Sequence, residues 1–216
     1  MDITYLGHSS FKIKGKNTSV VTDPFDPTMV GVKFPKTEAD IVIISHQHDD
    51  HNKAAQVEGV RKVLDTPGEY EIGGTSFIGI PSYHDAEKGA ARGKNTIFVI
   101  EMDGLRLCHL GDLGHKLDEG TLEEIGNVDI LFVPVGGVYT IDAKLASEVV
   151  TEIEPNVIIP MHFWDESMNK ESFADLAKVD AFLSEVGLKT ERLPKLSIKA
   201  GEISSEDQVV YVLDRK

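Results

Sequence analysis

The sequence predicts a layered α/β sandwich in which helices cover the outside of the sheets. Short β-rich segments separated by turn residues fill the first half of the chain, and strands alternate with helices in the second half. A parallel doubly wound sheet alternates strand and helix throughout, so it is disfavoured. The 216 residues are 41% hydrophobic, which is enough for a sizeable core. We therefore expect residues 1–216 to form one domain rather than two small ones.

The first half contains most of the predicted strands. The segments ITYLGHSSFKIKG and SVVTD, from Ile3 to Asp23, contain β-rich runs with turn residues between them. The run ADIVIIS at residues 39–45 is continuously apolar, as in a strand buried on both faces. A short helix is expected from Asn52 to Val60, with Gly59 near its end, and further strands are expected from Lys62 to Tyr83.

The remaining elements follow from turn and capping signals. Residues 95–112 contain two β-rich runs joined by Asp103-Gly104, the strongest short-range signal for a β-hairpin. Strands are expected in VDILFVPV, NVIIPMHF and QVVYVLD. Asp142 is a candidate N-cap for a helix that ends before Pro155. Its apolar stripe consists of Ala146, Val149, Val150 and Ile153. A last helix is expected from Lys170 to Val186, ending at Gly187.

Composition excludes several classes of partner and site. Lys and Arg number 22 against 36 Asp and Glu, so the formal charge is −14, and no basic run indicates a surface that follows phosphates. Extended nucleic acid and anionic membrane are disfavoured as partners. The start MDITYLGHSS lacks the features of a signal peptide and no stretch has the length of a membrane span, so we expect a cytoplasmic protein. Cys108 is the only cysteine, which excludes an internal disulfide and a thiolate-rich zinc site.

Polar residues that can bind metal follow the predicted strands. Five apolar runs end in a histidine or an aspartate, and these end residues are Asp23, His46, His84, Asp112 and His162. In open α/β sheets, sites form in the crevice beyond the carboxyl ends of the strands. We therefore expect these residues, although far apart in sequence, to meet at one edge of the sheets.

The stretch HQHDDH is the densest group of such residues. Three imidazoles and two carboxylates within one loop invite charge repulsion unless a cation is present. His46 and His48 lie two apart, so an extended segment would present both rings on one side. Asp50 and His51 can address a second position, and two metals about 3.5 to 4 Å apart would activate a bridging water. The sequence thus predicts a binuclear metal site with nitrogen and oxygen ligands.

Other polar residues have simpler explanations. A lone histidine at a strand end is more often hydrogen-bonded or solvated than a ligand, so His8, His109 and His115 are not expected to bind metal directly, although they can line the pocket. Asp23 could cap a turn before Pro24, and Asp112, next to a glycine, could belong to a turn. The pair Gly136-Gly137 lacks the phosphate-binding pattern of a P-loop. We interpret it as a loop that must pass close to the site.

Together these residues resemble the metallo-β-lactamase fold superfamily. Its signature H-x-H-x-D-H appears as residues 46–51, between a predicted strand and a predicted helix. The early aspartate of the family matches Asp23, its third histidine motif His84, its bridging aspartate Asp112 and its last histidine His162. The likeness runs nearly end to end. The segments ITYLGHSSF, CHLGD and VPVGGVYT look like the compact single-domain hydrolase branch that includes ascorbate-phosphate lactonases.

The resemblance implies a four-layer αβ/βα sandwich with two divalent metal ions at one edge of the paired sheets. Carried over residue by residue, His46, His48 and His84 would hold one metal, and Asp50, His51 and His162 the other. Asp112 would bridge the two. Asp23 would orient a histidine ligand, and we expect His8 and His115 to surround the ligands without binding metal. Zinc is the default metal, with manganese or iron as alternatives.

The leading hypothesis is hydrolysis of a small ester, lactone or phosphoester by a metal-activated hydroxide, with Asp50 orienting the hydroxide and moving a proton. Tyr83, Tyr139 and Trp164 are candidate pocket walls. One alternative is a phosphodiesterase acting on nucleotides or short oligonucleotides, which a basic residue such as Arg92 or Lys94 near the metals would favour. Another is a non-catalytic protein that binds metal or ligand. A polymer-cleaving nuclease and a flavin-linked redox enzyme are disfavoured, because the chain lacks the added domains of those relatives. The oligomeric state is not predicted.

Overall fold

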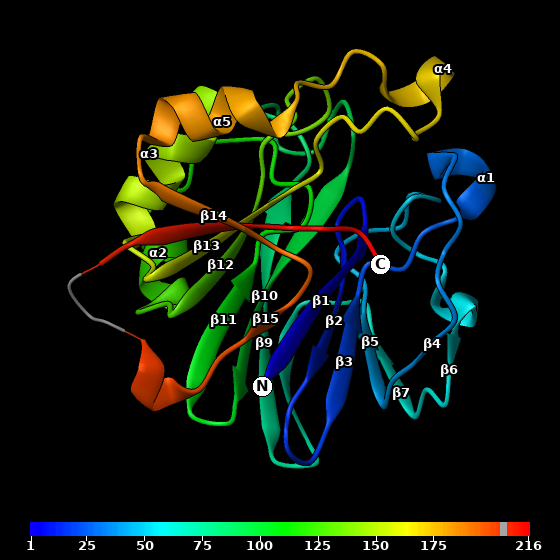
Figure 1. The fold of residues 1–216 in the computed structure, drawn as a ribbon, viewed down its shortest axis with the longest axis vertical. Helices are drawn as coiled ribbons and strands as arrows, with labels where there is room; N and C mark the ends of the chain where they lie inside the picture. The colour runs from blue at the N-terminus through cyan, green and yellow to red at the C-terminus, as the bar shows by residue number, and fades with distance from the viewer. Residues whose placement is uncertain (204–206) are drawn as a thin grey trace.

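The computed structural model describes residues 1–203 and 207–216. Its described residues form two large sheets packed face to face (Figure 1). The first sheet has six strands in the order β15 (Leu196–Ser197), β1 (Asp2–Gly7), β2 (Ser10–Lys14), β3 (Ser19–Thr22), β5 (Ile41–Ile43) and β7 (Lys62–Leu64). Beside it lies a two-stranded sheet of β4 (Thr37–Glu38) and β6 (Val57–Glu58).

The second sheet has eight strands within the described residues. Their order is β14 (Lys189–Leu193), β16 (Val209–Leu213), β13 (Val157–Met161), β12 (Ile130–Pro134), β11 (Leu105–His109), β10 (Lys94–Met102), β9 (Thr75–Tyr83) and β8 (Gly68–Ile72). Strands β8 to β11 pair antiparallel, and β11 to β14 pair parallel. The predicted hairpin is present, because Met102 pairs with Leu105 while Asp103 and Gly104 both have positive φ, as a type I′ turn requires.

Helices and loops cover the outer faces of the sheets, which gives the predicted four layers (Figure 1). The second sheet is covered by α2 (Glu119–Ile125), α3 (Ala143–Ile153) and α5 (Val179–Val186). The outer face of the first sheet is covered by long loops that contain α1 (Pro27–Val30), the 3-10 helix η1 (Ala54–Gln56) and α4 (Lys170–Phe173). A second 3-10 helix, η2 (Ala200–Glu202), precedes β16.

Helix α3 forms as its sequence predicts. Asp142 has an extended backbone and accepts a hydrogen bond from the N–H of Leu145 at 2.9 Å, so it is the N-cap. The four residues of the predicted stripe are the buried ones of this helix. They pack against the outer face of the second sheet. The core there is separate from the core between the two sheets.

Two helix predictions were wrong. The segment from Asn52 to Val60 contains only the short η1 and then strand β6, because its backbone pairs with neighbouring segments: the N–H of Lys53 donates to Pro24 O and the N–H of Ala39 to Glu58 O. The expected helix from Lys170 to Val186 is split into α4 and α5. At the break, the N–H of Ala177 donates to Gly136 O and its carbonyl accepts from Trp164 N, so these loops take the backbone groups that a continuous helix would use.

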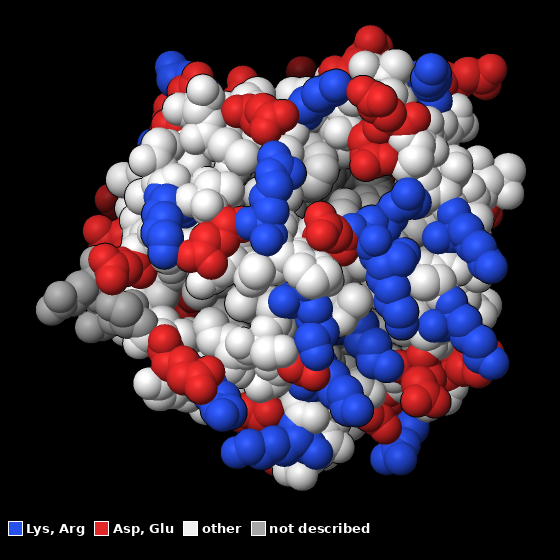
Figure 2. All heavy atoms as spheres, in the orientation of Figure 1, with Lys and Arg blue, Asp and Glu red and all other residues white. Residues whose placement is uncertain are grey.

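Charge is unevenly distributed over the surface. Figure 2 shows acidic and basic side chains interspersed over one face. Lys and Arg gather on it toward the C-terminus and β2. Lys33, Lys36, Arg215 and Lys216 line a recess of about 560 Å³ on the molecule. Although the overall charge is −14, the surface around this recess is locally basic. Among the described residues, no helix is long and apolar enough to cross a membrane.

The core between the two sheets holds together the strands whose ends carry the polar residues. Phe132 of β12 is fully buried there and its ring lies 4.7 Å from that of Phe11 in β2, so the pair joins the two sheets. We predict that Phe132→Ala lowers the free energy of unfolding by about 3 to 5 kcal/mol, because it leaves a cavity. Urea unfolding measures the change. Met29→Ala, at an exposed position of α1, should change it by less than about 0.5 kcal/mol; equal losses in both variants would contradict this packing.

Candidate metal centre

The polar residues at the ends of the strands converge on one edge of the sandwich. His8 follows β1, Asp23 follows β3, His84 follows β9 and His162 follows β13 directly. The loop of residues 46–51 follows β5, and Asp112 lies just beyond β11. Side chains from both sheets therefore meet, as the carboxyl-end argument predicts.

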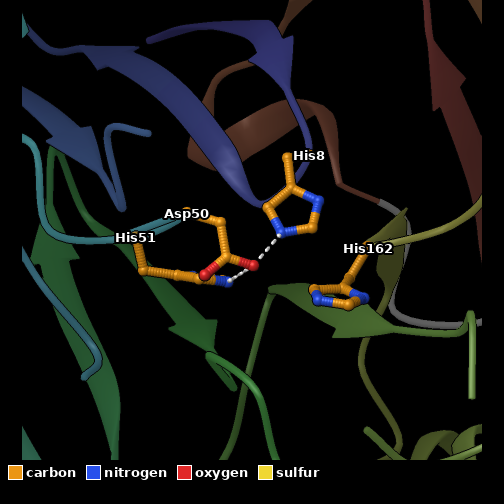
Figure 3. A group of neighbouring side chains, drawn as sticks. All are labelled: His8, Asp50, His51 and His162. Atoms are coloured by element: carbon orange, nitrogen blue, oxygen red, sulfur yellow. Dashed lines mark hydrogen bonds and ion pairs between the residues drawn. The ribbon is translucent and has the colours of Figure 1, made fainter. Parts of the chain in front are cut away.

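Among the residues that the structure describes, three groups of side chains bring ligand atoms within 4.8 Å of one another. The first cluster is His46, His48 and His84. The second cluster is His8, Asp50, His51 and His162, shown in Figure 3. The third, His46, His51 and Asp112, joins the other two. His48 is the exposed member, and the others are buried.

One carboxylate oxygen lies among four imidazoles. Asp112 Oδ2 is 3.1 Å from His162 Nε2, 3.2 Å from His51 Nε2 and 3.3 Å from His84 Nε2. His46 Nε2 is 3.9 Å away. These histidines come from three separate segments, so Asp112 stands between the first and second clusters.

Asp23 and Ser45 orient the histidines. Asp23 Oδ1 accepts a hydrogen bond from Ser45 N at 2.7 Å, and its Oδ2 accepts from the Ser45 hydroxyl at 2.6 Å and from His51 Nδ1 at 3.0 Å. Because Asp23 takes the Nδ1 proton of His51, the neutral form of this ring presents Nε2 as an acceptor toward the other clusters. The Ser45 hydroxyl in turn lies 2.9 Å from His46 Nδ1.

Glycines allow backbone segments to approach the site closely. A Cβ on Gly111 would lie 2.3 Å from Asn95 Oδ1, and one on Gly136 would lie 2.1 Å from the carbonyl oxygen of His162. The loop after Gly111 is held by Asn95, whose Oδ1 accepts from Asp112 N at 3.0 Å. The prediction that the Gly136-Gly137 loop passes close to the site is therefore confirmed.

Burial and charge shift the pKa values of these groups. Burial raises the pKa of Asp112, but His162 and His51 outweigh it and hold the pKa well below the ordinary value. Burial lowers the pKa of His51, yet the carboxylates of Asp112 and Asp50 raise it well above the ordinary value. Burial also lowers the pKa of His46 to about 3 and that of His8 to about 4, so both rings are neutral at pH 7.

The residues present fit a divalent metal centre. His46 Nε2, His51 Nε2 and Asp112 Oδ1 are buried without a hydrogen-bond partner among the described residues. Unpartnered buried polar atoms are costly and therefore rare in proteins. Neutral imidazole nitrogens and carboxylate oxygens are the ligand set that suits zinc, manganese and iron.

A cleft of about 670 Å³ opens beside the first cluster, and His46 and His48 form part of its wall. Arg92 and Lys94 line it, and so does Tyr83, which was predicted as a pocket wall. The Arg92 guanidinium donates to Val138 O at 3.0 Å and lies 5.0 Å from the ring centre of Tyr139. The cleft volume of about 670 Å³ is typical of small-molecule sites.

The structure separates some predicted residues from the clusters. His115 binds the backbone, with its Nε2 accepting from Tyr83 N, and His109 Nε2 donates to Ser9 O. Trp164 packs outside the first sheet. Ser45 and Asn95 were missed by sequence reasoning. The position of Ser45, directly before the histidine motif, was the available signal, whereas nothing in the sequence indicates that Asn95 reaches Asp112.

Comparison with known proteins agrees with this architecture. One similar protein of known crystal structure comes from Thermotoga maritima and is 38% identical in sequence to this chain. It is described as a Zn-dependent hydrolase of the metallo-β-lactamase superfamily, an activity attributed to it. It covers 98% of both chains with a TM-score of 0.78. A family model described as the β-lactamase superfamily domain matches residues 2–162, more than half of the chain. The chain belongs to the metallo-β-lactamase superfamily.

Curated relatives of this superfamily member carry the name UPF0173 metal-dependent hydrolase. That of Carboxydothermus hydrogenoformans is 30% identical over 191 residues, which are 76% of this chain and 84% of the relative. That of Thermococcus onnurineus is 28% identical over 189 residues, covering 74% and 84%. The predicted fold is confirmed, and the chain is an enzyme of the metal-dependent hydrolase class.

The loop after His84 supplies a test by pH. Asp85 accepts hydrogen bonds from the N–H groups of Glu87, Gly89, Ala91 and Arg92. Burial raises the pKa of Asp85, but these N–H groups outweigh it and lower the pKa from 3.8 to about 2. The stability that Asp85 contributes is therefore present above pH 3.8 and is lost as pH falls toward 2.

We predict that the difference in unfolding free energy between the wild type and Asp85→Ala shrinks over that pH range. Urea unfolding at a series of pH values measures it. Asp85→Asn, which keeps the shape and removes the charge, should show a difference with the same pH dependence. A difference that stays constant down to pH 2 would contradict the assigned role.

Proposed function

We propose that this enzyme hydrolyses a small anionic ester, lactone or phosphoester with a binuclear metal centre. The observation that carries the proposal is the position of Asp112 Oδ2 among four imidazole nitrogens, next to an open cleft. If this cluster had only a structural role, its buried polar atoms would stay unpaired, with no interaction to offset the cost of burying them.

The proposed ligand set divides along the clusters. His46, His48 and His84 would hold one metal ion at a first position, Asp50, His51 and His162 would hold the other at a second position, and Asp112, which lies between the clusters, would contribute to both. Asp23 orients His51 through the Nδ1 hydrogen bond. We propose zinc as the native metal. We also propose that residues 1–216 act as one domain, in the cytoplasm.

When bound, a pair of divalent ions acidifies a water molecule and polarises the substrate oxygen. The chain supplies the geometry. Asp50, buried beside His51, can orient the attacking water and accept its proton on the carboxylate. Asp112 lies beside His162 and His51, which hold its pKa well below the ordinary value, so it stays ionised at neutral pH.

The cleft supports a small anionic substrate. Arg92 and Lys94 line it, together with Asp65 as the acidic side chain among the described lining residues. A phosphodiesterase acting on nucleotides is the second candidate, and the placement of these two cations in the same cleft as His46 and His48 favours it. A non-catalytic role predicts metal binding without turnover.

We predict that His48→Ala loses the metal ion of the first position, that Asp112→Asn loses bound metal, and that both variants lose turnover. The loss should exceed the roughly 10- to 100-fold typical of residues that only orient ligands. Metal analysis of purified protein and a panel of chromogenic lactones, esters and phosphodiesters, with and without chelator, measure both. Turnover should vanish with chelator and return with zinc or manganese.

The matched control for these variants is His115→Gln, because His115 binds the backbone outside the clusters. It should lose far less activity and keep its metal. Normal metal content together with normal turnover in His48→Ala or Asp112→Asn would contradict the ligand assignment. Stable metal binding by the wild type without turnover on any of the panel would favour the binding role.

We further predict that Lys94→Ala raises KM for an anionic chromogenic phosphodiester by about 2- to 5-fold, the range of one exposed ion pair. KM for a neutral ester should stay unchanged. Added salt should weaken the effect, because it screens exposed charges. Lys144→Ala, on the outside of α3, is the control. An equal rise for both substrates would show that charge recognition is not the role of Lys94.

A further inference from the structure

His8 is the member of the second cluster that the proposed ligand set leaves unused (Figure 3). Its side chain is buried, with 2% of the residue exposed. Its φ of 56° lies in the left-handed region, which non-glycine residues seldom adopt. Such a conformation persists only where the surrounding contacts impose it, and it often marks a functional position.

The contacts of His8 reach two of the proposed ligands. Its Nε2 lies 3.1 Å from Asp50 Oδ2. Because an ionised carboxylate only accepts hydrogen bonds, the ring nitrogen must be the donor. The His8 carbonyl accepts from the backbone N–H of His162 at 3.0 Å and from the Tyr5 hydroxyl at 3.1 Å. The residue directly after β1 is therefore hydrogen-bonded both to a loop carboxylate and to a histidine that follows a strand of the second sheet.

The ring contacts of His8 lie in the same cluster. Its ring centre is 4.2 Å from that of His162, 5.0 Å from that of His51 and 5.1 Å from that of Phe173. Within the described residues, its recorded ring contacts and hydrogen bonds do not involve His46, His48 or His84. A change at His8 should therefore affect one metal position and spare the other.

We propose that His8 is a positioning residue for the second metal position, setting its affinity by orienting Asp50 through the Nε2–H donor and His162 through the backbone. This inference rests on the proposed two-metal function. It differs from a packing role because an apolar side chain of similar size would fill the same space without donating a hydrogen bond. The donor itself can therefore be tested.

The experiment measures zinc affinity by competition with a chromophoric chelator, on the wild type, His8→Leu and His8→Gln. The wild type should bind two equivalents. In His8→Leu one equivalent should weaken by about 10- to 100-fold, the usual effect of losing a partner that orients a ligand, and the other should be unchanged. His8→Gln should recover most of the affinity, because its amide N–H can donate to Asp50. The visible spectrum of the cobalt-loaded protein should change in His8→Leu and return toward wild type in His8→Gln.

Two further variants identify the position and the cause. In a His48→Ala background, where the second position alone keeps its full ligand set, adding His8→Leu should weaken the remaining equivalent. Phe173→Leu, which loosens the packing against the His8 ring, should lower the melting temperature and leave both affinities within about 3-fold. If His8→Leu does not fold, His8→Asn replaces it. Asparagine tolerates a left-handed backbone, but its shorter amide does not reach Asp50 from the same place.

The outcomes separate this inference from the proposed function. Wild-type binding of fewer than two equivalents would overturn the two-metal function. With two equivalents in the wild type, unchanged affinities in His8→Leu would overturn the positioning role alone. Equal weakening in His8→Leu and His8→Gln, or equal weakening in Phe173→Leu, would show that volume and packing matter rather than the hydrogen bond.

Discussion

The structure depends on placing one buried carboxylate oxygen among imidazoles that arrive from distant parts of the chain. Asp112 Oδ2 lies within 3.3 Å of nitrogens from three histidines that follow β5, β9 and β13. Removing a carboxylate from water costs several kcal/mol unless nearby charges or donors compensate. The two sheets meet this demand because both end at the same edge, where side chains from each can face the other. A core of buried side chains packs the two sheets together beneath that edge.

The regular part of the fold and the irregular part have separate tasks. The strands supply apolar packing, and the residues directly after them supply the polar atoms. His8, Asp23 and His162 all have positive φ although none is glycine. Each such residue costs on the order of 1 to 3 kcal/mol, a large share of the roughly 5 to 15 kcal/mol that stabilises a typical domain. Hydrogen bonds hold them in place: Asp23 N donates to Ile43 O, and His162 N donates to His8 O. The abrupt turns let the side chains leave the strand direction and face inward.

Sequence reasoning reached the parts of this arrangement that are local in the chain. The apolar stripe and N-cap of α3, the Asp103-Gly104 hairpin and the strands that end in histidine or aspartate all depend on neighbouring residues. The two helix predictions were wrong because tertiary hydrogen bonds, such as the one between Ala177 and Gly136, determine the backbone there. Sequence periodicity does not encode such bonds. The same holds for Asn95, whose contact with Asp112 joins residues 17 apart. Sequence could mark His8 only as a lone histidine, because its meaning comes from Asp50, 42 residues away.

Net charge and local charge lead to different conclusions about the substrate. A formal charge of −14 argues against a long polyanion, since repulsion acts over the whole surface. Beyond about 8 to 10 Å, however, exposed charges are largely screened at physiological salt, so a small ligand in the cleft interacts mainly with the side chains that line it. Those include Arg92 and Lys94, and Arg92 is held in place by Val138 O and the ring of Tyr139. The acidic composition is therefore compatible with the small anionic substrate that we propose, although the net charge is unfavourable for a large one.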